Sequence, residues 1–227
     1  MSAPEFSDFF DASRFSHIEL FRKGDAVWLA VPRIAEYLQT LQLDENHADI
    51  TGSPVIEGAV HIGPGSRIDP GAYIQGPAWI GENVHIRHGA YIRGNVIVGN
   101  GSVLGNSCEF KNSILMNNVQ VPHFSYVGDS ILGNNTHLGA GVICSNLRTD
   151  QAEICVDWDG NKFDTGLRKL GVITGDDVEV GCQSVLNPGS LLGKSSWLHP
   201  GVVWAGSCPP HSRVLNRNMV KWRSQER

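Results

Sequence analysis

Four side chains in the middle of the chain are of types that bind and activate a charged substrate. Arg93 and Lys111 stand 18 residues apart, and His123 and Tyr126 follow within the next 15. Two cations brought together repel unless an anion lies between them, and a phosphate accepts hydrogen bonds from both. An imidazole titrates near neutral pH and can remove a proton from a nucleophile. These residue types favour a site for a phosphorylated molecule, provided that the fold brings them together.

Each of these residues also has a plainer interpretation. With 18 lysines and arginines in 227 residues, one pair at this spacing could arise by chance. Nine histidines are present, and a lone histidine is more often structural than catalytic. Tyr126 could equally be a packed aromatic ring. The choice depends on the elements that carry these residues.

Those elements follow a repeat of six residues. From residue 62 onward every sixth residue is apolar, and a mostly small residue follows four positions later. The apolar series is Ile62, Ile68, Ile74, Ile80, Ile86, Ile92, Val98, Leu104, Phe110 and Met116. Neither a helix nor an alternating strand has a period of six. A hexapeptide period predicts a parallel β-helix.

Three hexads make one coil of 18 residues, so equivalent residues of adjacent coils lie roughly 4.8 Å apart. Arg93 and Lys111 are therefore expected to stack on one outer face. The period slips near Val121 and again at Leu132, which predicts two deformed corners. Irregularity in a regular repeat is expected where function requires it. His123 lies between the two slips, where its ring can project from the coil.

The ends of the chain lack the repeat. Residues 1–55 are predicted to form a small N-terminal α/β cap over the first coil, with one helix over 32–43 and two short strands around residues 23–25. A separate ligand site in this segment is the alternative. Residues 209–227 are predicted as a C-terminal cap with a short helix.

The β-helix itself is predicted over 56–208. An excursion at 144–171 interrupts it and contains a hairpin that turns at Asp159-Gly160. An excursion of this length usually closes a site or reaches a neighbouring subunit.

Composition limits the classes of partner. The net charge of −5 and the pI of about 6.0 do not favour binding to nucleic acid or to an anionic membrane. Five cysteines, an odd number without a CxxC pair, favour a reducing, cytoplasmic compartment. No apolar run is long enough to span a membrane, and the first residues lack the pattern of a secretion signal.

Metal binding is the competing interpretation of the histidines. His123 and His137 are 14 residues apart and could approach one another across the two slips. Cys144 is a weak third candidate, and no further ligand occurs at a coil-related spacing. No metal is therefore expected.

The segment PHFSYVGDS, followed by LGAGVICSNLR, resembles the acetyltransferase domain of bifunctional sugar-1-phosphate nucleotidylyltransferase/glucosamine-1-phosphate N-acetyltransferases. GAYIQGPAWIGENVHI, GAYIRG, EFKNSILM, LRKLG and LNPG extend the similarity over about residues 60–205. This resemblance implies a left-handed β-helix that forms homotrimers with sites shared between subunits. We expect no counterpart of the nucleotidylyltransferase half in this sequence, because residues 1–55 are too few to form it.

The resemblance also implies roles for individual residues. His123 matches the catalytic general base, Asn146 an asparagine beside the reacting groups, and Ala140 a backbone donor near the thioester. Arg93, Lys111 and Tyr126 match groups that hold the sugar phosphate. Two positions depart from the family: His137 replaces a substrate-contacting asparagine, and Ala152 replaces a lysine. Lys169 and Lys194, with Arg168, could meet the phosphates of coenzyme A or be solvated.

These expectations favour an acetyl-CoA-dependent N-acetyltransferase that acts on an amino-sugar phosphate such as glucosamine-1-phosphate. In chemical terms, a base removes the proton of the attacking amine, and a backbone amide near Ala140 stabilises the developing oxyanion. One alternative is an acyltransferase that uses a nucleotide sugar or a longer acyl chain. Another is a non-catalytic trimeric partner of a separate nucleotidylyltransferase.

Overall fold

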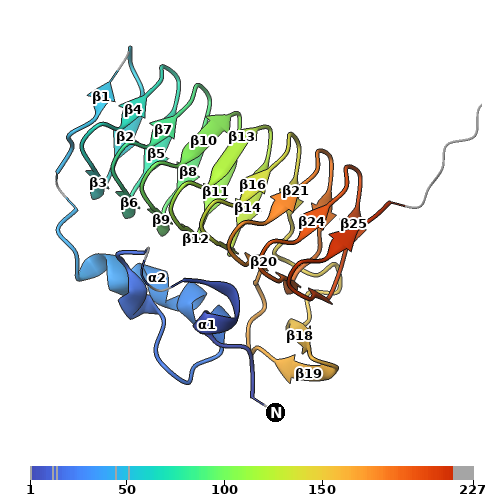
Figure 1. Ribbon diagram of the computed structural model, residues 1–227. Helices are drawn as coiled ribbons and strands as arrows, with labels where there is room; N and C mark the ends of the chain where they lie inside the picture. Colours follow the sequence, from blue (N-terminus) through green and yellow to red (C-terminus); the bar gives the residue numbers. More distant parts are fainter. Residues whose placement is uncertain (1, 12, 14, 44, 51, 217–227) are drawn as a thin grey trace, which may run out of the picture.

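The chain winds into a parallel β-solenoid. The computed structural model describes residues 2–11, 13, 15–43, 45–50 and 52–216. Three long sheets of parallel strands run along one axis, and each strand is hydrogen-bonded to the equivalent strands of adjacent coils (Figure 1). The predicted left-handed parallel β-helix is confirmed.

The three sheets are named after their first strands. The β1 sheet consists of β1(Asp49–Ile50), β4(Arg67–Ile68), β7(His85–Ile86), β10(Val103–Asn106), β13(Gln120–His123), β16(His137–Leu138), β21(Glu179–Val180), β24(Trp197–Leu198) and β27(Arg213–Val214). The β2 sheet consists of β2(Val55–Glu57), β5(Tyr73–Gln75), β8(Tyr91–Arg93), β11(Glu109–Lys111), β14(Tyr126–Gly128), β17(Ile143–Cys144), β22(Val185–Leu186) and β25(Val203–Trp204). The β3 sheet consists of β3(Val60–Ile62), β6(Ala78–Ile80), β9(Val96–Val98), β12(Ser113–Leu115), β15(Ile131–Leu132), β20(Val172–Thr174), β23(Ser190–Leu192) and β26(Ser207–Cys208).

The inward side chains of successive coils stack into apolar ladders. Ile62 pairs with Ile80, and Ile80 pairs with Val98 one coil further on. All three side chains are fully buried. Burial of each such side chain contributes about 1.5–3 kcal/mol, so the ladder stabilises the solenoid along its whole length.

Both shortened steps occur at the corner between the β2 and β3 sheets. Phe110 is followed inward by Leu115 after five residues, and the second step ends at Leu132 as predicted. The predicted slip near Val121 is therefore wrong by one hexad. Met116 does not point inward but lies in an apolar layer outside the β3 sheet. The sequence pattern could not separate the two positions, because adjacent residues are both large and apolar.

Strand pairing starts and ends slightly outside residues 56–208. At the beginning, β1 pairs with β4, and at the end β27 pairs with β24. The predicted C-terminal helix, over 216–227, lies outside the described residues except for its first residue.

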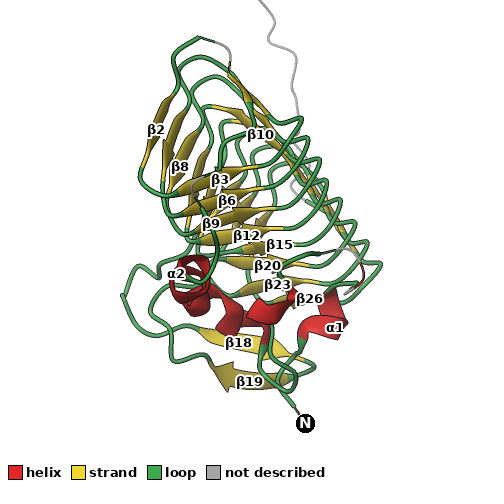
Figure 2. Cartoon of the chain, turned by 90° about the vertical axis from the view of Figure 1, so that its left-hand side faces the viewer, coloured by secondary structure: helices red, strands yellow, loops and turns green. Residues whose placement is uncertain are grey.

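The N-terminal segment lies along the flank of the solenoid. It contains α1(Phe6–Phe9), η2(Ile18–Leu20), η3(Val27–Leu29) and α2(Ala30–Gln39). Figure 2 shows these helices against the outer face of the β3 sheet, so they do not cover the first coil as predicted. The helix containing Pro32 is confirmed, whereas the two strands expected around residues 23–25 are replaced by the short helices η2 and η3.

The reason for this placement is an apolar outer face on the β3 sheet. Its outward side chains are Trp79, Ile97, Ile114, Ile131, Ile173 and Leu191. The N-terminal segment covers this face with Phe9, Trp28, Ile34 and Leu38, all buried. An uncovered row of this kind would expose a continuous apolar patch to water.

The excursion between β17 and β20 contains the predicted hairpin. β18(Cys155–Trp158) and β19(Asn161–Asp164) pair in an antiparallel manner. Trp158 packs on Phe9 with ring centroids 5.2 Å apart, and Phe163 lies 6.5 Å from Trp28. The hairpin therefore joins the N-terminal segment beside the β3 sheet (Figures 1 and 2). Within the described residues, no helix is both long and apolar enough to cross a membrane.

Candidate functional site

His123 ends β13 at the corner between the β1 and β2 sheets, and its side chain is exposed. Phe124, the next residue, has a φ of 51° and is 60% exposed. Among the described residues, the His123 imidazole has no hydrogen bond or ion pair, and its ring centroid lies 6.0 Å from that of Phe124. An imidazole without partners at an exposed corner is available to a bound molecule.

Ala140 lies one coil beyond His123. The Gly141 N–H donates to the His123 carbonyl over 3.0 Å, and the Ala140 carbonyl accepts from Gln183 N–H at 2.8 Å. The predicted general base and the predicted backbone donor are thus on neighbouring rungs. His137 occupies the same sheet, where its Nδ1 lies 2.8 Å from Glu179 Oε2.

Arg93 and Lys111 end the neighbouring strands β8 and β11, as their spacing predicts. Each cation has a carboxylate partner: Arg93 Nη1 lies 2.5 Å from Glu109 Oε1, and Lys111 Nζ lies 3.3 Å from Asp129 Oδ2. The Arg93–Glu109 pair is partly exposed, and exposed pairs are worth only about 0–1 kcal/mol. A phosphate can therefore compete with Glu109 for Arg93. Both cations nevertheless have carboxylate partners in this structure.

Tyr126 and Asn146 meet above Gly128. A Cβ added to Gly128 would lie 2.4 Å from the Tyr126 hydroxyl oxygen and 2.7 Å from Asn146 Nδ2. Glycine is required here because any side chain would displace one of these polar groups. Burial raises the pKa of Tyr126, and the nearby carboxylates of Asp129 and Glu109 raise it further. The Tyr126 hydroxyl thus stays protonated and can donate a hydrogen bond.

Asp129 is the residue that the predicted set lacks. Its backbone has a φ of 49°, and the residue is 4% exposed. The carboxylate accepts from Asn112 Nδ2 over 2.8 Å, from Asn146 Nδ2, and from Lys111 Nζ. The signal was present in the sequence, because Asn112, Asp129 and Asn146 are spaced by 17 residues, the length of a coil that contains one shortened step.

A cleft of about 570 Å³ opens beside Asp129. Its lining combines the corner, both ends of the excursion and the start of α2: Val31, Pro32, Asn112, Asp129, Leu147, Gln151, Leu167, Arg168 and Lys169. Lys169, predicted to bind the cofactor, therefore lines the same cleft as Asn112 and Asp129. Among the described residues, Lys169 has no acidic partner.

Lys194 lies apart from the other predicted residues. Its Nζ donates to the carbonyl of Ser7 over 3.1 Å, which fixes the N-terminal segment to the solenoid. Lys194 Nζ also lies 3.5 Å from the carbonyl of Phe10, so the role of this residue in binding coenzyme A stays a prediction. No group of three or more potential metal ligands occurs in the described part of the chain.

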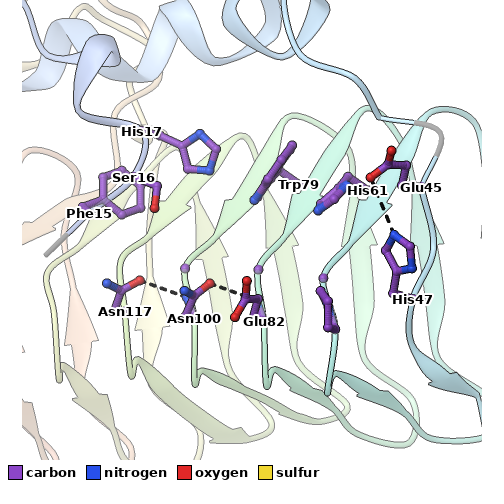
Figure 3. A pocket seen from close by; sticks show the side chains of 14 residues that line it. Phe15, Ser16, His17, Glu45, His47, His61, Trp79, Glu82, Asn100 and Asn117 are labelled. Carbon is purple, nitrogen blue, oxygen red and sulfur yellow. Dashed lines mark hydrogen bonds and ion pairs between the residues drawn. The ribbon is translucent and has the colours of Figure 1, made fainter.

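A second cavity, of about 330 Å³, lies between the N-terminal segment and the first coils. In Figure 3 the rings of His17, Trp79 and His61 form a row along it. The His61 and Trp79 rings stack at 3.7 Å, and His17 Nδ1 lies 3.0 Å from the Tyr37 hydroxyl. Burial, together with nearby His61, lowers the pKa of His17 to about 4. The cavity contains none of the predicted site residues.

Comparisons with known proteins agree with this fold. The family model described as the GMPPB C-terminal domain matches residues 74–196. The bifunctional sugar-1-phosphate nucleotidylyltransferase/acetyltransferase of Sulfurisphaera tokodaii is 37% identical over 166 residues, which are 73% of this chain and 41% of that protein. The bifunctional protein GlmU of Methanococcus aeolicus is 45% identical over 144 residues, 63% of this chain and 35% of that protein. The uncharacterized acetyltransferase YaiX of Escherichia coli K12 is 32% identical over 191 residues, 83% of each chain.

The solenoid and these relatives define a protein of the hexapeptide-repeat acyltransferase class. The chain belongs to the family of the GMPPB C-terminal domain. It spans less than half the length of the bifunctional relatives that it matches.

Proposed function

We propose that the protein is an acetyl-CoA-dependent N-acetyltransferase that acts on an amino-sugar phosphate, such as glucosamine-1-phosphate. The observation that carries this proposal is the exposed His123 imidazole, which has no partner among the described residues, at a corner next to Tyr126. Arg93 and Lys111 end adjacent strands of the same β2 sheet as Tyr126. The names of the bifunctional relatives, which include an acetyltransferase, support the reaction class.

In the proposed reaction, His123 takes a proton from the amine as its nitrogen attacks the thioester carbonyl. The nitrogen–carbon bond forms, the carbon–sulfur bond breaks, and the thiolate of coenzyme A receives a proton. A backbone N–H near Ala140 stabilises the oxyanion. Arg93 and Lys111 hold the phosphate, and Lys169 meets a phosphate of coenzyme A.

We also propose that three copies associate and that a neighbouring copy completes the groove at the His123 corner. The exposed Phe124 ring at this corner supports an apolar contact there. All five cysteines are free, which agrees with a cytoplasmic location. An acyltransferase acting on a nucleotide sugar is the second candidate, because such an acceptor also carries phosphate that Arg93 and Lys111 could bind.

The test is release of free thiol from acetyl-CoA in the presence of glucosamine-1-phosphate. We expect thiol release that depends on both substrates and yields one acetylated sugar per thiol. The same measurement with nucleotide-linked amino sugars and longer acyl-CoAs separates the two candidates. If none of these acceptors gives thiol release above the rate measured without protein, the enzymatic function is rejected.

A further inference from the structure

Two of the predicted site residues, Lys111 and Asn146, meet at a carboxylate that has no assigned role. Asp129 accepts hydrogen bonds from two side-chain amides and from an ammonium group, and its own carboxylate is only 6% exposed. A buried carboxylate is costly unless it is paired and hydrogen-bonded, and here it is both. The arrangement therefore holds its three donors in fixed positions.

The consequence for Asn146 is an assigned orientation of its side-chain amide. A carboxylate can only accept hydrogen bonds, so it binds the NH₂ end of an asparagine and turns the oxygen away. Asn146 Nδ2 points to Asp129, and the same NH₂ group lies against the Tyr126 hydroxyl over Gly128. The side-chain oxygen of Asn146, Oδ1, is thus left to accept a hydrogen bond from another group.

We propose that Asp129 is a positioning residue that fixes the side-chain oxygen of Asn146, Oδ1. In this orientation Oδ1 can accept a hydrogen bond from an N–H or O–H of the substrate that receives the acyl group. This inference rests on the proposed function, because Asn146 is expected beside the reacting groups. An oxygen presented in this way binds an amine and orients its lone pair towards the thioester carbon. It disfavours an acceptor that presents only oxyanions at this position.

Asp129 also neutralises the positive charge of Lys111. The ammonium lies 3.3 Å from the carboxylate, so Lys111 and Asp129 together are nearly neutral. Replacement of Asp129 by asparagine would release this lysine for an anionic ligand. The two consequences are separable, because one affects the orientation of the amine and the other affects binding of the phosphate.

The variant Asp129→Asn is therefore expected to lower kcat without raising KM for the phosphorylated acceptor. An asparagine at 129 offers one acceptor oxygen where the carboxylate offers two. The side-chain amide of either Asn112 or Asn146 must therefore flip. Loss of a hydrogen bond to a charged group corresponds to about a ten- to hundredfold fall in kcat. A purely structural role would lower the amount of folded protein and leave both constants of the folded fraction unchanged.

The matched control is Asp176→Asn. Asp176 is also buried, at 5% exposed, and accepts from Asn134 N, Asn134 Nδ2 and Asp11 N, each at 2.8 Å. It lies on the β3 side of the solenoid, under the N-terminal segment, where Phe9 accepts from its N–H. We expect this variant to lose stability to a similar extent but to keep the kcat and KM of the wild type.

A second measurement does not depend on activity. In protein labelled with ¹⁵N-asparagine, we expect the Asn146 NH₂ protons to exchange with water at least about tenfold more slowly than those of Asn106, which donates to a neutral carbonyl at 3.1 Å. Exchange at Asn146 should quicken in Asp129→Asn and not in Asp176→Asn. Absence of thiol release by the wild type would reject the proposed function alone, since the exchange rates still test Asp129. Wild-type kcat in Asp129→Asn, or exchange at Asn146 as fast as at Asn106, would overturn the inference.

Discussion

Replacement of His123 by alanine is expected to lower kcat for acetyl transfer by about two to four orders of magnitude, the usual contribution of a general base. The imidazole is exposed and has no hydrogen bond or ion pair among the described residues. Its removal should therefore change the free energy of unfolding by no more than about 0.5 kcal/mol. The measurements are steady-state thiol release and denaturant unfolding of the same preparation.

The control is His211→Ala, which removes another exposed imidazole from the last coil. This variant should keep both the rate and the stability of the wild type. A His123→Ala protein that is folded and retains more than a tenth of the wild-type kcat would exclude His123 as the base.

The second large effect concerns the stability of the protein in acid. His17 is 6% exposed, and burial beside His61 holds its folded-state pKa at about 4, below the ordinary value of 6.5. Between these two values the unfolded chain binds the proton more readily than the folded protein, so stability is lost as the pH falls from about 6.5 to 4. The shift corresponds to about 3 kcal/mol, which is a large part of the stability of a typical domain.

The substitution His17→Gln tests this effect, because glutamine does not titrate and can still bond to the Tyr37 hydroxyl. We expect the free energy of unfolding of the wild type to fall by about 3 kcal/mol more than that of the variant between pH 7 and pH 4. Denaturant unfolding at several pH values provides the comparison. Parallel pH curves for the two proteins would show that His17 is not buried in its neutral form.

The sequence was sufficient to predict the solenoid, because an apolar residue every six positions fits no other regular structure. The first shortened step was misplaced for a local reason: Leu115 and Met116 are adjacent, and either could continue the series. The position of the N-terminal segment was not predicted, because the period of six identifies only the inward residues. The outward row from Trp79 to Leu191 also recurs at coil spacing and indicated a covered flank.

For the candidate site, the repeat predicts the strand position of each residue and no more. Arg93 and Lys111 stand on adjacent strands because their spacing equals one coil. Their carboxylate partners were not foreseen, since Glu109 and Asp129 reach them from the following coils, and side-chain reach across coils has no signature in a period. The partners of Lys194 were not foreseen for a similar reason, because they are backbone carbonyls of a segment distant in sequence.

The most direct test of the account is a structure of the protein with coenzyme A and glucosamine-1-phosphate bound. We predict that the sugar amine lies within about 2.6–3.2 Å of the His123 ring, directly or through one water, with its phosphate at Arg93 and Lys111. Both ligands bound elsewhere, for example in the cavity beside His17 and Trp79, with neither touching His123, would contradict it.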